Sequence, residues 1–476
     1  MNKPFFLIIL FFLLSLNLSG QVSQELKNEN LPLPLPKVDQ RIELLSIVFR
    51  LAGNSEYNMD RFKDYVKDIH DHFDKYKEHP VIKFAIALRE KNGVSYDAVM
   101  AMAVHLKQPP VLSPVIPFTA SVPESRWGID NANKFVALLK QFYKEAKCEE
   151  FFKQHQELYK LAQERFKTTV FDSFDNSWYK LYYGKQPDGS MNIIIGLGNG
   201  GQNYGSKIVY PDGRENAYAI MGTWSVDNEG KPSYTASGYM PTLVHEFNHS
   251  FVNHLIDKNE KELEASGKLL FEPVKSIMQG QAYSNWKTMM QEALVRASVV
   301  RYLMKHNSDE NDAKGEMKTQ ISNGFLWMKS LVDTLGYYET NRTKYPTLES
   351  FMPCLIGFYK ETADKYNTFL DNCVHVKAIE PFNNNAVDVL PELTEMKVIF
   401  DKPLTGKGYS IWLGKNGKEF FPIVDKGIKY ADNNTAIILN IKLKSNTEYE
   451  FLMVGRAFKT PDGFPLIDYK VTFKTK

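Results

Sequence analysis

The sequence predicts an α+β protein, in which a mainly helical region with a small sheet is followed by a separate all-β domain over residues 387–476. Three observations carry this prediction. Apolar residues recur three and four positions apart along most of the chain up to about residue 372. Short β-prone runs between glycine and asparagine turns interrupt that spacing between residues 192 and 223. Beyond residue 387, strand-like runs alternate with turns such as Lys-Asn-Gly and Pro-Asp-Gly.

The N-terminus has the layout of an export signal over residues 1–20. Lys3 supplies the positive charge, the apolar core runs from Phe5 to Leu16, and small residues precede Gln21. An uncleaved N-terminal anchor is the alternative. No cysteine follows the apolar core, which argues against lipid attachment there. We therefore expect an exported protein, in a periplasmic or extracellular space, with no membrane span in the mature chain.

Residues 21–36 are predicted to be a Pro-rich linker, because the alternation of leucine and proline over 31–36 cannot form a helix. A helical N-terminal region is expected over 37–170, where apolar side chains such as Phe135 and Leu139 follow helical spacing.

The middle of the chain combines the small sheet with helices that resume at about Met240. A strand-like run over 192–195 leads into Gly196-Leu197-Gly198-Asn199-Gly200-Gly201, which matches the G-x-G-x-x-G pattern of dinucleotide-binding loops by letter. Such a loop has to open a helix, whereas the strand-like Lys207 to Tyr210 follows here. We therefore interpret it as a glycine loop or edge that lines a cleft, because glycine allows close backbone approach.

The sharpest chemical signal is His245-Glu246-Phe247-Asn248-His249, an H-E-x-x-H motif. Apolar residues at helical spacing surround it, and Pro241 suits an opening turn, so the motif is expected on an amphipathic helix. Four residues of a helix turn through about 400° and rise about 6 Å, which brings both imidazoles to one face. His245 and His249 are thus predicted to bind one zinc ion, with Glu246 beside them to take a proton from a metal-bound water. The alternative is a surface helix with two solvated histidines.

A catalytic zinc ion needs a third protein ligand and an open fourth position. Glu292 is the best candidate, because it borders a buried helix face, where a carboxylate needs a cation or hydrogen-bond donors. Arg296, one turn later, is expected to orient or neutralise Glu292 without touching the metal. A solvated Glu292–Arg296 pair on the surface is the alternative.

Other candidate ligands near the motif are weaker. His254 stands nine residues after His245, which turns it to the opposite side of the helix. The remaining fallback ligands are Glu260, Glu262 and Glu264, in a charged run that is typical of a solvated face.

With these residues the chain resembles the gluzincin group of zinc metallopeptidases, in which a glutamate on a later helix completes H-E-x-x-H. The resemblance implies that His245, His249 and Glu292 bind zinc, that Glu246 is the general base, and that residues 171–383 form a zincin-like catalytic domain.

Two related groups fit less well. Metzincins require a glycine and a histidine at the positions of Val252 and Leu255, so that class is excluded. Thermolysin-like enzymes have Asn-Glu-x-x-Ser-Asp around the third ligand, where this chain has Gln-Glu-Ala-Leu-Val-Arg.

The same resemblance implies a mechanism, in which zinc activates water and Glu246 passes the water proton to the leaving amine. The strand before the active-site helix, over 217–223, is expected to line the cleft and pair with an extended peptide. The donor to the oxyanion stays open among Tyr239, Tyr283, Tyr337 and Tyr338.

Four segments of the last domain carry a second resemblance. They are Val398-Ile399-Phe400-Asp401-Lys402-Pro403, Leu443 to Tyr449, Thr460-Pro461-Asp462-Gly463 and Phe473-Lys474-Thr475. In these the domain at 387–476 resembles the bacterial immunoglobulin-like domains of exported proteins. The resemblance implies a β-sandwich that spaces or docks a catalytic domain and performs no chemistry.

Composition narrows the partners and the redox chemistry. The 58 basic and 56 acidic residues leave a net charge of +2, which argues against a general nucleic-acid binder. Export into an oxidising space allows Cys354 and Cys373 to pair, and three buried thiols are the alternative. No C-x-x-C pair exists for a thiolate metal site.

Together these features predict an exported zinc-dependent peptidase that acts on a peptide or protein substrate. Two alternatives stay open. One is a zinc hydrolase of a non-peptide substrate, and the other is an exported binding protein whose zinc site is structural or degenerate.

Overall fold

The computed structural model describes residues 33–185, 189–306 and 310–476. The predicted export signal over 1–20 and the linker up to residue 32 lie outside these described ranges. Within them no helix has both the length and the hydropathy to cross a membrane. The architecture is mixed α+β, as the sequence predicts.

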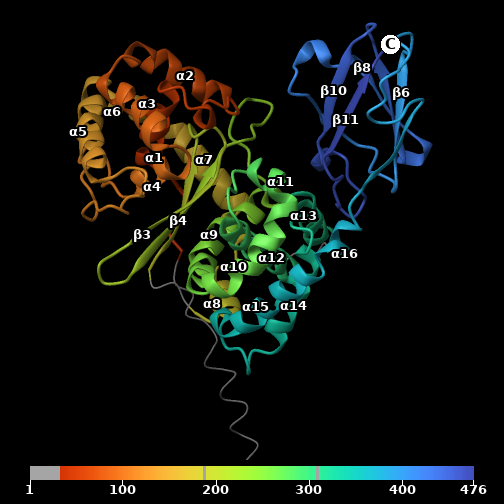
Figure 1. Ribbon diagram of the computed structural model, residues 1–476. Helices are drawn as coiled ribbons and strands as arrows, with labels where there is room; N and C mark the ends of the chain where they lie inside the picture. Colours follow the sequence, from red (N-terminus) through yellow and green to blue (C-terminus); the bar gives the residue numbers. More distant parts are fainter. Residues whose placement is uncertain (1–32, 186–188, 307–309) are drawn as a thin grey trace, which may run out of the picture.

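Helices and strands follow one another along the chain as labelled in Figure 1. The helices are α1 (Gln40–Leu51), α2 (Lys63–Phe73), α3 (Pro80–Asn92), α4 (Asp97–Val104), α5 (Ile129–Glu145), α6 (Cys148–Gln154), α7 (Gln156–Thr169), α8 (Ser177–Tyr183), α9 (Ala236–Lys258), α10 (Glu260–Phe271), α11 (Lys275–Gln279), α12 (Trp286–His306), α13 (Glu310–Ser322), α14 (Met328–Thr340), α15 (Leu348–Asp364) and α16 (Tyr366–Leu370). The strands are β1 (Lys37–Val38), β2 (Met191–Gly196), β3 (Tyr204–Val209), β4 (Glu215–Gly222), β5 (Val376–Glu380), β6 (Glu395–Phe400), β7 (Ile411–Leu413), β8 (Ile423–Ala431), β9 (Ala436–Ile441), β10 (Glu448–Met453) and β11 (Tyr469–Lys474).

The first sheet joins the two helical parts of the chain. Its strand order is β1-β2-β4-β3, with β1, β2 and β4 parallel and β3 antiparallel at one edge. The run of isoleucines in β2 is buried, as expected for a strand covered on both faces. Figure 1 shows the strands between the N-terminal helices and the helices from α9 onward. β3 contacts both groups, through α4 and α9.

The prediction that residues 217–223 form the cleft-lining strand is wrong. This segment belongs to β4, which has hydrogen-bonded neighbours on both sides. The chain turns back after β2 and pairs β3 with β4 from Glu215 to Ile220, which covers most of the edge that β4 would otherwise expose. The free edge of the sheet beside the later helices therefore belongs to β3.

The described residues form two hydrophobic cores. One extends from Ile42 to Cys373, and the other lies between Val374 and Phe473 in a C-terminal β module, residues 376–476. The module consists of two antiparallel sheets, β5-β6-β9-β8 and β11-β10-β7. It begins before the predicted boundary at residue 387, because β5 pairs with β6.

All three cysteines are free, so the expected pairing of Cys354 with Cys373 is wrong for this structure. The Sγ atom of Cys354, on α15, lies 3.2 Å from the hydroxyl oxygen of Tyr345. Cys373 is buried where the chain leaves α16 for the β module. The two residues bracket a helical stretch in sequence, but each thiol packs within its own local surroundings.

A buried glutamate holds the glycine-rich loop over 196–201. Glu43, on α1, has no exposed surface, and its two carboxylate oxygens accept the backbone N–H groups of Leu197 (2.8 Å) and Gly198 (3.0 Å). A bound phosphate would need the same kind of N–H groups. Here they serve the protein's own carboxylate, and β3 rather than a helix follows the loop, as predicted. Burial raises the pKa of Glu43 to about 7.

We predict that Glu43 makes the protein less stable as the pH rises from about 4.5 to about 7. Because its pKa is higher in the folded than in the unfolded chain, the stabilisation is complete below the unfolded pKa and is lost as the pH passes the folded pKa. The loss is on the order of 3 kcal/mol. Urea unfolding of the wild type and of Glu43→Gln gives the free energy of unfolding of each across this pH range. The difference between their two pH dependences is the contribution of Glu43.

The control for this experiment is Glu157→Gln. Glu157 is an exposed residue of α7 that pairs with Lys160, so this variant should keep the wild-type pH dependence. If Glu43→Gln also keeps it, Glu43 titrates at its ordinary pKa and the prediction fails.

Candidate metal centre

Helix α9 carries both predicted histidines on one face. It begins at Ala236, where the side chain of Thr235 accepts a backbone N–H of the first turn. Because this cap lies so early, Pro241 stands inside the helix and not in its opening turn, contrary to the sequence prediction. The Nε2 atoms of His245 and His249, one turn apart, are separated by 3.2 Å.

The environment of the two imidazoles suits metal binding. Their side chains are 16% and 21% exposed, so solvent reaches them. Burial lowers the pKa of His245 well below its ordinary value, which keeps the ring neutral at pH 7. Nδ1 of His249 lies 3.1 Å from the amide oxygen of Asn253, to which it donates. In the neutral ring this bond makes Nε2 of His249 the acceptor nitrogen, which is the form that ligates a metal.

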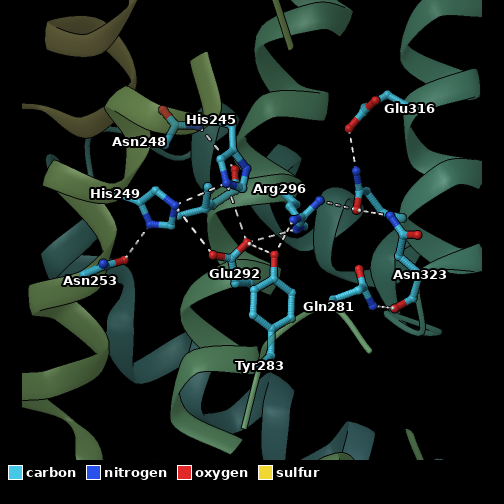
Figure 2. A network of polar contacts seen from close by, with 12 residues as sticks. His245, Asn248, His249, Asn253, Gln281, Tyr283, Glu292, Arg296, Glu316 and Asn323 are labelled. Atoms are coloured by element: carbon cyan, nitrogen blue, oxygen red, sulfur yellow. Dashed lines mark hydrogen bonds and ion pairs between the residues drawn. The ribbon is translucent and has the colours of Figure 1, made fainter. Parts of the chain in front are cut away.

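Glu292, on α12, meets the histidines from the opposite side, as Figure 2 shows. Its Oε2 lies 3.6 Å from Nε2 of His245, and its Oε1 lies 3.6 Å from Nε2 of His249. The buried Asn248 donates to the carbonyl oxygen of Val295, which ties α9 to α12 at this level. The structure thus brings together the three ligands that the sequence predicts, with one ligand atom of each within 4.8 Å of the others.

The two oxygens of Glu292 have different surroundings. Oε2 accepts hydrogen bonds from the Tyr283 hydroxyl (3.0 Å) and from Nε of Arg296 (3.1 Å), whereas no hydrogen bond to Oε1 is found among the described residues. Burial alone would raise the pKa of Glu292, but His245 and Arg296 outweigh it and hold the pKa at about 2. Arg296 remains charged when the imidazoles are neutral, so the carboxylate stays ionised. Arg296 therefore has the orienting contact predicted for it.

Glu246 lies between α9 and the edge strand β3. The backbone N–H of Gly205, on β3, lies near its carboxylate and favours the charged form. A Cβ atom at position 205 would lie 2.8 Å from Oε2 and 2.9 Å from the backbone oxygen of Glu246, so only glycine fits this approach. Burial, reinforced by the charge of Glu292, raises the pKa of Glu246 to about 7. Glu246 is not among the three converging ligands and is available as a proton acceptor.

The weaker candidates do not join the group. His254 is not one of the converging residues and faces a set of charged groups that includes Lys258 and Lys207. Glu260 pairs with Lys287, and neither it nor Glu262 or Glu264 approaches the histidines.

Of the four tyrosines that the sequence left open, only Tyr283 lies in the network of Figure 2. The ring of Tyr239 stacks on Trp224, and the hydroxyl of Tyr338 donates to the carbonyl oxygen of Tyr182. Tyr337 is exposed.

Sequence reasoning missed three contributors to the site: Gly205, Asn253 and Gln320. Asn253 stands one turn after His249, so helical spacing could have found it. Gln320, on α13, accepts a hydrogen bond from Arg296, and Gly205 comes from the edge strand. No sequence signal links these two positions to the motif, because tertiary packing alone brings them there.

Fold and site together define an α+β protein with a preformed group of two histidines and a glutamate. The chain belongs to the family described as a domain of unknown function (DUF4932), whose model matches residues 35–358. This range includes every residue of the site and ends before the C-terminal β module. No curated protein matches the sequence.

Among solved structures, parts of the S-layer protein SbsC are similar to this chain. One crystal structure is 16% identical over 49% of this chain and 33% of that chain, with a TM-score of 0.17. The N-terminal part of the same S-layer protein is 13% identical over 53% of this chain and 61% of that chain, also with a TM-score of 0.17. The chain thus spans less than two thirds of either S-layer structure, and TM-scores this low support no argument.

We predict that Gly205→Ala destabilises the protein by about 1–3 kcal/mol, because the new methyl group pushes β3 away from α9. Urea unfolding measures the change. The matched substitution is Gly357→Ala in α15, where nothing lies within 4 Å of the added Cβ. There the loss of glycine from a helix should stabilise by about 0.5–1 kcal/mol. If both variants gain stability, β3 does not approach Glu246 as closely as the structure indicates.

Proposed function

We propose that this protein is an exported zinc-dependent peptidase, in which His245, His249 and Glu292 hold the metal and Glu246 is the general base. The observation that carries the proposal is the convergence of these three ligand groups from two helices. Two imidazole nitrogens and one carboxylate oxygen are the donor set of catalytic zinc sites, which keep a fourth position open.

The spacing of the ligand atoms supports zinc. Tetrahedral ligands at about 2.0–2.1 Å from a zinc ion lie roughly 3.4 Å from one another. The separations here are 3.2 Å between the histidine nitrogens and 3.6 Å from each nitrogen to its nearer Glu292 oxygen. At 3.6 Å these pairs are too long for direct hydrogen bonds, so the charge of Oε1 calls for a cation. Since Oε2 is engaged by Tyr283 and Arg296, Oε1 is the expected ligand atom.

When bound, zinc would supply a Lewis acid that polarises a carbonyl and lowers the pKa of a water molecule toward 7. Glu246 has a pKa of about 7, so it can accept a proton near neutral pH and return it to a leaving amine. Gly205 allows β3 to pass close to this carboxylate, because glycine has no Cβ atom to prevent the approach. Arg296 keeps Glu292 ionised and oriented throughout.

The position of β3 favours a peptide substrate over a non-peptide one. An edge strand has backbone groups that an extended peptide can pair with, which binds the peptide largely independently of its sequence. The strand passes Glu246 at Gly205, and the side chain of Lys207 farther along the strand is exposed. A peptide paired with β3 would run beside the proposed base.

Three further expectations belong to the same proposal. The region over 171–383 would be a zincin-like catalytic domain, supported by the sheet edge, the motif helix α9 and the glutamate helix α12. The C-terminal β module would be an immunoglobulin-like sandwich, supported by its two antiparallel sheets and separate core. Export is supported by the sequence of residues 1–20.

We predict that the purified protein binds one zinc ion per chain and that His249→Ala abolishes this binding. Loss of one of three protein ligands removes a bond that the remaining two cannot replace. Metal analysis after gel filtration measures the stoichiometry. His254→Ala, which removes a histidine from the same helix outside the ligand group, is the control and should retain the metal. Metal-free wild-type protein after zinc loading would overturn the proposal.

We predict that Glu246→Gln retains zinc but lowers the rate of peptide hydrolysis by about 10²–10⁴-fold, because the amide cannot accept the water proton. Cleavage of a diverse peptide mixture, followed by mass spectrometry, measures the rate and reveals the preferred sequence. Retained cleavage in this variant would exclude Glu246 as the base. Zinc binding without cleavage of any peptide by the wild type would favour a binding protein or a hydrolase of another substrate.

A further inference from the structure

The last turn of α13 lies behind the metal centre and is connected to Glu292 by two routes (Figure 2). In the first, Nη1 of Arg296 donates to Oε1 of Gln320 (2.8 Å), and Nε of the same arginine donates to Oε2 of Glu292. Gln320 is buried, and its amide nitrogen donates to Glu316 one turn earlier, which fixes the direction of the amide. The orientation of Arg296 therefore depends on where α13 places Gln320.

The second route passes through the segment between α11 and α12. The amide nitrogen of Gln281 donates to the carbonyl oxygen of Asn323 at the end of α13 (2.8 Å). Two residues later, the hydroxyl of Tyr283 donates to Oε2 of Glu292 and accepts from Nη2 of Arg296 (2.6 Å). Both hydrogen bonds to Oε2 thus depend on groups that the end of α13 holds.

The C-terminal β module contacts this same turn of α13. The hydroxyl of Ser322 donates to the carbonyl oxygen of Gly463 (2.8 Å), and this contact is buried. Gly463 has a φ of +95°, and a Cβ atom there would lie 2.4 Å from the carbonyl oxygen of Lys318. Two backbone segments therefore meet directly, with no side chain between them that could absorb a displacement.

The part of the module that makes this contact is a closed turn. Gly463 N–H donates to the carbonyl oxygen of Thr460, and the backbone N–H of Thr460 donates to the carbonyl oxygen of Phe464. Phe464 packs against the hydrophobic core of the main domain rather than that of the module. We name residues 460–464 the docking turn. It is rigid and anchored in the main domain, so it can fix the position of α13.

We propose that the docking turn is a positioning element of the metal centre. It seats the last turn of α13, so that Gln320 and Asn323 hold Arg296 and Tyr283 on Oε2 of Glu292 and leave Oε1 beside His249 without a hydrogen-bond donor. The inference rests on the zinc site proposed above and assigns the β module a role in the affinity of that site. Loss of outer hydrogen-bond partners typically weakens metal binding 10–100-fold, which sets the expected scale.

The test compares two glycine substitutions in the β module. Gly463→Ala places a methyl group against Lys318, whereas Gly417→Ala, at a φ of +84°, has nothing within 4 Å of the new Cβ. Both replace a left-handed glycine, so they share the backbone strain and differ in the contact with α13. We expect Gly463→Ala to weaken zinc binding about 10-fold in competition with a chromophoric chelator, and Gly417→Ala to leave it unchanged. Equal affinities in the two variants would overturn the inference.

A double-variant cycle tests whether the docking turn acts through Gln320. If the docking turn acts through Gln320, Gly463→Ala and Gln320→Ala together weaken zinc binding less than the product of their separate effects. Independent effects would show that the turn does not act through this residue and would overturn the inference. If Gly463→Ala does not fold, Ser322→Ala replaces it in the cycle, because it removes the hydroxyl that can donate to the carbonyl oxygen of Gly463 and to that of Lys318 within α13.

A readout without metal separates this inference from the proposed function. Faster amide hydrogen exchange over 281–283 and 318–323 in Gly463→Ala, but not in Gly417→Ala, would support the docking turn as the element that holds these segments. Unchanged exchange there would overturn it. If the wild type binds no zinc, the proposed function fails and this exchange measurement alone decides whether the module positions the end of α13.

Discussion

The buried, ionised carboxylate of Glu292 is the constraint on which the site depends. A carboxylate in such surroundings is costly unless each oxygen has a partner of opposite charge or a hydrogen-bond donor. Arg296 and Tyr283 both donate to one oxygen, and the other lies 3.6 Å from Nε2 of His249, a distance that hydrogen bonding does not use. The two oxygens of Glu292 thus have different partners. Helix α12 supplies Arg296 to one oxygen, α13 holds Arg296 through Gln320, and α9 brings His249 near the other oxygen.

The need of a carboxylate for nearby partners also explains why the chain has a glycine where β3 passes α9. Glu246 must be close enough to the strand for a backbone N–H to reach its carboxylate, and a side chain at position 205 would prevent that approach. Glu43 likewise lies close to backbone at the carboxyl end of the parallel strands, where its carboxylate accepts hydrogen bonds from N–H groups of the glycine-rich loop. In both places a carboxylate of the protein lies beside backbone N–H groups, and burial raises the pKa of both carboxylates.

The C-terminal β module has its own hydrophobic core, but it also packs against the main domain. Its docking turn contributes Phe464 to the core of the main domain and meets α13 through backbone atoms. The family match ends at residue 358, so the candidate metal centre lies within the matched range and the β module lies outside it.

The sequence by itself determined the local chemistry of this protein. Helical spacing placed His245 and His249 on one face, and the need of a carboxylate at a buried helix face for a partner singled out Glu292 and Arg296, because these rules act within one or two turns. Only the tertiary structure decided that β3 is the edge strand, that Gly205 approaches Glu246, that Gln320 accepts from Arg296 and that the docking turn contacts α13. These contacts join segments far apart in the chain, and their geometry depends on strand order and helix packing, which the spacing of residues in a sequence does not encode.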